Sequence, residues 1–277
     1  MCLIAFAIDA VPGAPLVVAA NRDEFHQRPS AALHRWTLDD GTEVVGGRDL
    51  REGGTWMAVT PGGRVAWLTN VRQGQPESGR RSRGELVVRW LQSSQDGRAF
   101  AQGIKAGDHG GFNLVVGDLR RGEWTWIANR DPSRPHDEQA PRLHTAPLGR
   151  GVHTVSNASL NTPWPKARRL CAALSDALRS GPVGGTAWPG ALATTLTDTR
   201  IAPDDELPRT GVPLAAERSL SSPFVRMPDR GYGTRCSTLL TWHADGTLDL
   251  EEWSHDPGRT LPALDPAFHR RERLTVA

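Results

Sequence analysis

Short apolar segments with the period of β-strands, separated by glycine and proline, fill the first half of the chain. Residues 2–8 and 16–20 are both apolar, and Pro12 and Gly13 lie between them. This pattern predicts a β-hairpin whose connection is somewhat longer than a two-residue turn. The end of the second strand should then lie near the start of the first.

The same pattern continues along the chain, with turn-forming residues between paired segments. Pro61 to Gly63, Arg120 to Gly122, and Asp245 with Gly246 are such turns. The strands expected around them and elsewhere are residues 55–59, 64–70, 112–116, 124–127, 152–155, 237–243 and 248–253.

Three segments change to a helical period. Residues 84–92 follow Ser82, a candidate N-cap, and residues 191–196 form a second short helix. The strongest amphipathic pattern begins near Pro165, with apolar side chains on one face at Ala167, Leu170, Cys171, Leu174, Ala177 and Leu178. Runs of strands alternating with runs of helices predict mainly antiparallel sheets with helical layers outside them.

Polar segments complete the pattern. The loops at residues 72–83 and 132–142 are rich in turn-forming residues, and we expect them to form mobile rims or substrate loops. The arginine-rich tail at residues 270–273 is expected to be a solvated, charged chain end.

Composition narrows the class of protein. The chain has 277 residues with 38% hydrophobic content, and we expect one domain over residues 1–277. Its net charge of +2 does not favour nucleic acid as a partner. No apolar run is long enough for a membrane-spanning helix, and no basic segment precedes the first apolar run as in a secretory signal, so a cytoplasmic location is expected.

The three cysteines carry further information. They stand at positions 2, 171 and 236, without the spacing of a zinc site or of a disulfide framework. We therefore expect no metal and no cofactor, and a small molecule as substrate or ligand. The oligomeric state does not follow from the sequence.

Cys2 is the first candidate catalytic residue. If Met1 is removed, Cys2 carries both a thiol and a free α-amine, with reference pKa values of about 8.5 and about 7.7 to 8.0. A nucleophile and its base would then share one residue. The alternative is a cysteine that only fills space at the start of a buried strand.

Asn21, Arg22, Asp23 and Glu24 follow directly after the second strand, so the hairpin places them near Cys2. A guanidinium there would favour the thiolate, and a carboxylate could orient the α-amine. Because Arg22 and Asp23 are adjacent, they should point to opposite sides of the strand, which leaves open whether Asp23 or Glu24 faces the site. A charged, solvated turn is the alternative.

Two strand-terminal asparagines and a late glycine-rich segment are further candidates. Asn70 and Asn157 each stand at the end of a predicted strand, where a side-chain amide could stabilise an oxyanion or simply form a turn. Tyr232 lies between two glycines, which permit close backbone approach, and is a candidate substrate-binding residue. Arg235 could bind an anionic group or pair with Asp23.

These motifs together resemble a known family. Met1 to Ile4, Asn21 to Glu24, Thr69 to Arg72, Ser82 to Gly84, Ser156 with Asn157 followed by residues 160–166, and Tyr232 to Arg235 resemble the NRDE family, which includes the transport-and-Golgi-organisation proteins. The resemblance extends from residue 2 to about residue 255.

The NRDE family is in turn similar to N-terminal nucleophile hydrolases of the cholylglycine hydrolase and penicillin V acylase type. That similarity implies an α+β fold, a four-layer αββα sandwich. It also implies a catalytic set of Cys2, Arg22, Asp23, Asn157 and Arg235, with Asn70 as a further member. The acylases separate their arginine and aspartate in sequence, whereas Arg22 and Asp23 are adjacent here.

Two functions follow from the resemblance. The first is an N-terminal cysteine amidohydrolase that cleaves an amide or thioester bond of a small acylated substrate. The second is a non-catalytic binding or trafficking protein, because eukaryotic relatives are linked to Golgi organisation, lipid metabolism and haem transfer. A shared fold does not decide between the two.

Overall fold

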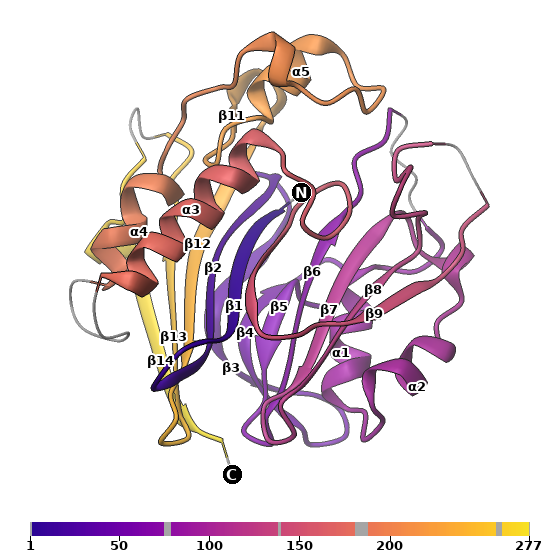
Figure 1. Cartoon of the computed structure of the whole chain (residues 1–277), viewed down its shortest axis with the longest axis vertical. Coiled ribbons are helices and arrows are strands. Elements are labelled where there is room, and N and C mark those ends of the chain that lie inside the picture. Colours follow the sequence, from indigo (N-terminus) through magenta and orange to yellow (C-terminus); the bar gives the residue numbers. More distant parts are fainter. Residues whose placement is uncertain (1, 75–78, 138–139, 181–187, 259–261, 277) are drawn as a thin grey trace.

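Two antiparallel β-sheets pack face to face in the computed structural model, which describes residues 2–74, 79–137, 140–180, 188–258 and 262–276 (Figure 1). The strands of the first sheet, in spatial order, are β10 (Gly151–Val155), β1 (Cys2–Val11), β2 (Ala14–Phe25), β12 (Tyr232–Trp242), β13 (Thr247–Ser254) and β14 (His269–Thr275), with β11 (Arg226–Met227) paired to β12. The strands of the second sheet are β3 (Ser30–Thr37), β4 (Glu43–Asp49), β5 (Met57–Val59), β6 (Arg64–Asn70), β7 (Phe112–Asp118), β8 (Glu123–Ala128) and β9 (His144–Pro147).

Helices cover the outer face of each sheet (Figure 1). The helices are α1 (Gly84–Leu91), α2 (Gly97–Gln102), α3 (Pro165–Arg179), α4 (Trp188–Leu196) and α5 (Leu214–Ser219), with 3₁₀ turns at Ala106–Asp108, Asp204–Glu206, Pro228–Arg230 and Pro266–Phe268. Helix α3 packs on β1 and α4 on β2, while α1 packs on β6 and α2 on β8. The predicted four-layer αββα sandwich is confirmed.

The apolar run of β1 is buried on both of its faces. Ile4, Phe6 and Ile8 point into the core between the sheets, whereas Leu3 and Ala5 face α3 and α4. The strand is therefore apolar throughout rather than alternating. Truncating Phe6 to alanine should cost about 3 to 5 kcal/mol of stability. This central position fixes where the chain begins, and with it the position of Cys2.

The predicted hairpin between β1 and β2 is confirmed, but its expected longer connection is wrong. Val11 pairs with Ala14, so only Pro12 and Gly13 form the turn. The extra residues are absorbed by an irregularity between Ile8 and Val11, where Asp9 adopts a positive φ of 46°. A bulge of this kind was not visible in the apolar pattern.

The charged segment at residues 270–273 is mostly exposed, as expected, but it is part of a strand rather than a free chain end. Residues 270–273 lie in β14, an edge strand that pairs with β13. Arg271 and Arg273 donate hydrogen bonds to Asp249 of β13 at 2.7 to 3.0 Å. Charged side chains are common on edge strands, where they hinder pairing with another chain.

The predicted helices are present with small differences at their ends. Arg83, not Ser82, is the N-cap of α1, although the Ser82 hydroxyl accepts the Gly84 N–H at 3.3 Å. Of the two expected rim loops, residues 75–78 and 138–139 lie outside the described residues.

Candidate active site

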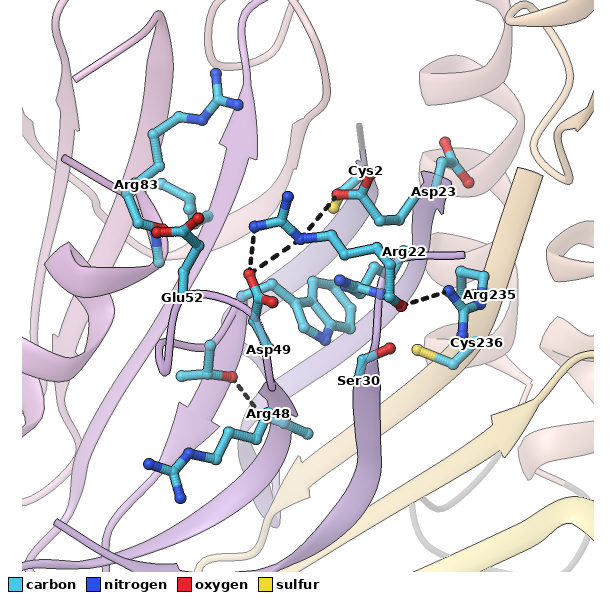
Figure 2. A pocket seen from close by; sticks show the side chains of 18 of the residues that line it. Cys2, Arg22, Asp23, Ser30, Arg48, Asp49, Glu52, Arg83, Arg235 and Cys236 are labelled. Atoms are coloured by element: carbon cyan, nitrogen blue, oxygen red, sulfur yellow. Dashed lines mark hydrogen bonds and ion pairs between the residues drawn. The ribbon is translucent and has the colours of Figure 1, made fainter. Parts of the chain in front are cut away.

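A polar cavity of about 450 Å³ opens at one end of the sandwich, between the two sheets (Figure 2). The first sheet contributes the start of β1, the end of β2, the start of β12 and the end of β13. The second sheet contributes the start of β3 and the ends of β4 and β6, and the loops at residues 49–56 and 79–84 complete the wall. The predicted site residues in its wall are Cys2, Arg22, Asp23, Glu24, Asn70 and Arg235.

Strand register brings Cys2 and Arg22 together. Cys2 lies directly opposite Arg22 in the β1–β2 pair, and Arg22 lies opposite Cys236 in the β2–β12 pair. Residues opposite each other in antiparallel strands point to the same face. All three therefore point to the side of the first sheet that faces the second sheet, where the cavity lies.

Cys2 is only 7% exposed, and the groups around its thiol shift the thiol pKa in opposite directions. Burial raises the pKa of the Cys2 thiol, and the carboxylate of Asp23 raises it further. Arg22 and a hydrogen bond from the backbone N–H of Asp23 lower the same pKa. On balance the pKa is raised, which favours the neutral thiol at neutral pH.

Arg22, Asp23 and Glu24 alternate across β2, so Asp23 points away from Arg22 (Figure 2). Asp23 accepts a hydrogen bond from the Thr234 hydroxyl at 2.7 Å on the side of the helical layer. Burial raises the pKa of Asp23, although Lys166 lowers it. Asp23 and Glu24 are both part of the cavity wall. Asp23 lies behind Cys2, and Glu24 lies beside Arg28.

An ion pair fixes the mouth of the cavity. Arg28 donates to Asp49 from Nε at 3.1 Å and from Nη2 at 2.5 Å. Arg28 also lies 4.0 Å from Glu24, so one arginine joins the end of β2 to the end of β4. This pair links the two sheets across the opening.

Further guanidinium groups line the cavity and outnumber its carboxylates. Arg22, Arg48, Arg80, Arg81, Arg83 and Arg235 all line the cavity. Burial lowers the pKa of Arg83 despite the nearby Glu24, and its Nη1 donates to the Gly111 carbonyl at 3.4 Å. An anionic ligand group would find several cationic partners here.

Arg235 occupies the bulge in β12. The register shifts between Thr234 and Cys236, which makes Arg235 the extra residue of that strand. Its guanidinium donates to the carbonyls of Phe25 and Arg28, at 2.9 and 3.1 Å. It is thus Thr234, its neighbour, that bonds to Asp23.

Asn70 and Asn157 occupy different positions. Asn70 ends β6 in the cavity wall, whereas the fully buried Asn157 lies behind it. Nδ2 of Asn157 donates to the Asn70 carbonyl at 2.9 Å, and the Asn157 carbonyl accepts the Arg72 N–H at 2.8 Å. Asn157 therefore holds the strand end that carries Asn70.

Tyr232 lies outside the main cavity. Its buried ring meets Phe25 edge to face at 5.1 Å and lines a neighbouring cavity of about 160 Å³. Burial raises the pKa of Tyr232 well above its ordinary value, so the hydroxyl stays protonated. The expected close approach at its flanking glycine is present, since a Cβ on Gly233 would lie 2.7 Å from the Val225 carbonyl.

Several residues of the site were missed by sequence reasoning. Lys166 of α3 is fully buried beside Asn157, and its Nζ donates to Asn157 Oδ1 at 3.2 Å. Cys236 and Glu252 form a hydrogen-bonded pair in the cavity wall, and burial raises the pKa of both. Strand pairing brings Cys236 and Glu252 to the site, and the packing of α3 on β1 brings Lys166.

Two kinds of feature are missing from the part of the chain that the structure describes. It holds no group of three His, Cys, Asp or Glu side chains arranged to bind a metal ion. Nor does any helix within it have the length and apolar character needed to cross a membrane.

Fold and site together define a class: an αββα sandwich with a cysteine at the head of a central strand, beside a basic cavity between the sheets. Within that class, the chain belongs to the Transport and Golgi organisation 2 family, whose model matches residues 1–257. The family predicted from the sequence motifs is confirmed.

Relatives with this family name match nearly the whole chain. The Transport and Golgi organization protein 2 homolog of Bos taurus is 33% identical, covering 94% of this chain and 96% of that protein. The homolog of Homo sapiens is 31% identical, covering 92% and 93%.

Solved structures of two hydrolases align with most of the chain. A Caenorhabditis elegans N-acylethanolamine-hydrolyzing acid amidase ortholog aligns with a TM-score of 0.49 at 12% identity, covering 86% of this chain and 92% of the other. The C2A mutant of the conjugated bile acid hydrolase from Clostridium perfringens aligns with a TM-score of 0.48 at 8% identity, covering 96% and 93%.

Proposed function

We propose that the cavity is the active site of an N-terminal cysteine amidohydrolase that cleaves an amide or thioester bond of a small acylated substrate. The observation that carries the proposal is the setting of Cys2. Its thiol lies at the head of β1, opposite Arg22, receives the Asp23 backbone N–H, and reaches a cavity of about 450 Å³. That volume suits a small-molecule ligand.

The base in this proposal is the α-amine that loss of Met1 would leave on Cys2. Asp23 follows Arg22, the partner of Cys2, and so lies next to the Cys2 backbone nitrogen that would become this amine. A carboxylate in that place orients the amine and stabilises its protonated form. The raised pKa of the thiol is compatible with this chemistry, because the proton leaves only as sulfur attacks.

The reaction divides into two halves. The amine takes the thiol proton while sulfur bonds to the substrate carbonyl carbon, and the oxyanion accepts a hydrogen bond from the side-chain amide of Asn70. The ammonium then returns its proton to the leaving amine or thiol, which departs and leaves a thioester on Cys2. Water, deprotonated by the same amine, cleaves the thioester, releases a carboxylic acid and regenerates the thiol.

The basic wall indicates the kind of substrate. Arg22 and Arg83 act electrostatically on Cys2, and Arg48 and Arg235 line the same cavity. We therefore expect an acyl substrate that also carries an anionic group, bound by charge-assisted hydrogen bonds. Neutral acyl amides of the same size should be poorer substrates.

The test combines intact mass with a panel of acyl amides and thioesters, with and without a carboxylate. Wild type should have lost Met1 and should hydrolyse at least one substrate, and Cys2→Ala should reduce kcat more than a thousandfold. Cys171→Ala is the matched control, because Cys171 is a half-buried thiol on α3 whose sulfur lies outside the cavity wall. Retained Met1, or equal turnover by wild type and Cys2→Ala, would exclude the proposal.

A non-catalytic binding function is the second candidate. The observation that favours it is the small exposure of Cys2, 7%, together with the raised pKa of its thiol. If the protein only binds its ligand, wild type and Cys2→Ala should bind that ligand equally well. Titration with haemin, read from a saturable and stoichiometric Soret shift, tests the haem form of this candidate.

A further inference from the structure

The chain has two lysines, in contrasting settings. Lys105 is exposed, whereas Lys166 is 1% exposed in the first turn of α3. An ammonium group is rarely buried, because it loses its hydration. The first turn is also the positive end of the helix dipole, where a cation is unfavourable. Stability alone would therefore favour an apolar residue at position 166.

Hydrogen bonds lead from Lys166 to the cavity wall. Its Nζ donates to Asn157 Oδ1 at 3.2 Å, and Nδ2 of the same amide donates to the Asn70 carbonyl at 2.9 Å. The lysine, which can only donate, and the Ser156 hydroxyl, which donates to the same oxygen at 3.2 Å, together turn the Nδ2 end of the Asn157 amide toward Asn70. The side chain of Asn70 lines the cavity, while Lys166 does not.

Charges around Lys166 alternate in sign. Asp23 and Arg72 are the charged groups with the largest effect on its ammonium group, followed by Cys2 and Glu217. Asp23, Arg72 and Glu217 are all buried, and Arg72 pairs with Glu217. Burial lowers the pKa of Lys166 to about 8, even though Asp23 acts to raise it. In return, Lys166 is the charge that most strongly lowers the pKa of Asp23.

We infer that Lys166 is a positioning residue of the proposed active site, which holds Asn157, and through it Asn70, while its charge balances the Asp23 carboxylate beside Cys2. This inference rests on the proposed function. It assigns Lys166 no contact with the substrate, because the residue lies behind the wall.

A pH effect follows from the charges that face the freed α-amine. Asp23 and Glu24 of β2 both interact with the positive amino end of the chain and favour the protonated amine. The cations that act on Cys2, Lys166 of α3 and Arg22 of β2, disfavour it. Lys166 therefore helps to keep the amine unprotonated, and available as a base, near neutral pH. Without this lysine, the pKa of the amine should rise.

The test compares Lys166→Met with Lys105→Met, the matched substitution of the exposed lysine. Lys166→Met should lower kcat at least tenfold, leave KM within about twofold, and move the acid limb of the kcat/KM profile to higher pH. Lys105→Met should change none of these. Unchanged kcat and an unchanged profile in a folded Lys166→Met protein would overturn the inference, although Cys2-dependent turnover would still stand.

A second measurement needs no substitution and no turnover. Wild-type protein labelled with ¹³C at lysine Cε should give only two lysine signals in NMR spectra. One of the two signals, that of Lys166, should titrate near pH 8. The absence of any lysine signal that titrates near pH 8 would overturn the inference even if the Lys166→Met protein does not fold. A wild type without Cys2-dependent activity would instead remove the proposed function.

Discussion

The buried ion pair between Arg72 and Glu217 should be a main support of the wall behind the cavity. Arg72 Nη1 donates to Glu217 Oε2, and both side chains are 3% exposed. The other carboxylate oxygen accepts the Thr210 N–H at 3.1 Å and the Thr210 hydroxyl at 2.6 Å. The Arg72 guanidinium also lies over the Trp164 ring, 4.7 Å from its centroid.

Glu217→Gln removes the charge and keeps the shape. The amide oxygen can still accept from Thr210, so that the main loss is the counter-charge of Arg72. Removing one partner of a buried pair costs about 3 to 5 kcal/mol, because the remaining charge stays buried and uncompensated. With the Thr210 hydrogen bonds retained, we expect a loss of about 3 kcal/mol in the free energy of unfolding.

Urea denaturation at pH 7 measures this loss, provided that the slope with denaturant is unchanged. Arg218→Gln is the control, because Arg218 follows Glu217 on α5 and pairs with Asp204 at the surface, at 2.5 and 2.7 Å. Exposed pairs contribute about 0 to 1 kcal/mol. Replacing both Arg72 and Glu217 by apolar residues should recover much of the loss. If Glu217→Gln costs no more than Arg218→Gln, the pair does not support the wall as argued.

Three further predictions concern stability. Burial raises the pKa of Asp249, but hydrogen bonds from two arginines of β14 outweigh this effect and lower the pKa to about 2, below the unfolded value of about 3.9. The stabilisation from Asp249 is therefore present above pH 4 and is lost as the pH falls to 2. The urea midpoint of Asp249→Asn should accordingly change less with pH over that range than the midpoint of wild type. Burial lowers the pKa of His255 to about 4, below the unfolded value of about 6.5, so stability should fall as the pH drops between these values, and His255→Gln should weaken that fall; an equal fall in both proteins would contradict the assignment. Gly54→Ala would place a Cβ 2.6 Å from the Gly84 carbonyl carbon and should cost about 1 to 3 kcal/mol, whereas an unchanged melting temperature would show that the loop yields freely.

Local sequence patterns predicted the parts of the fold that depend on neighbouring residues. Hairpins joined by glycine or proline turns, such as β5–β6 and β12–β13, place apolar alternation and turn chemistry in one short window. The same reasoning placed Arg22 next to Cys2, because a hairpin of that length must return the chain to its start.

The sequence patterns did not predict three strands, β3, β4 and β14, whose pairing depends on residues distant in the chain. In β3 the apolar positions are interrupted by His34 and Arg35, because the strand lies at a sheet edge. In β4, Gly46 lacks a side chain because a Cβ there would lie 2.6 Å from the Met57 carbonyl, so the strand signal is weak. In β14 the charged residues gain partners only after β13 has formed.

The site was predictable only in part, for the same reason. Cys2, Arg22 and Asp23 are related through one hairpin, whereas Lys166 meets Asp23 and Asn157 only after α3 packs on β1. In the sequence, Lys166 is one polar residue at the start of an amphipathic helix, where an exposed side chain is the ordinary expectation. Its burial depends on groups that stand opposite it in the folded chain.

The most direct test of the proposed function is to trap the acyl-enzyme. A carboxylate-bearing acyl substrate is mixed with wild type, Cys2→Ala or Cys236→Ala, quenched in acid during turnover, digested and analysed by mass spectrometry. We expect an acyl group on the peptide that begins with Cys2 in wild type and in Cys236→Ala, and no acylated peptide in Cys2→Ala. Acylation of Cys236 instead, or substrate turnover that continues in Cys2→Ala, would contradict it.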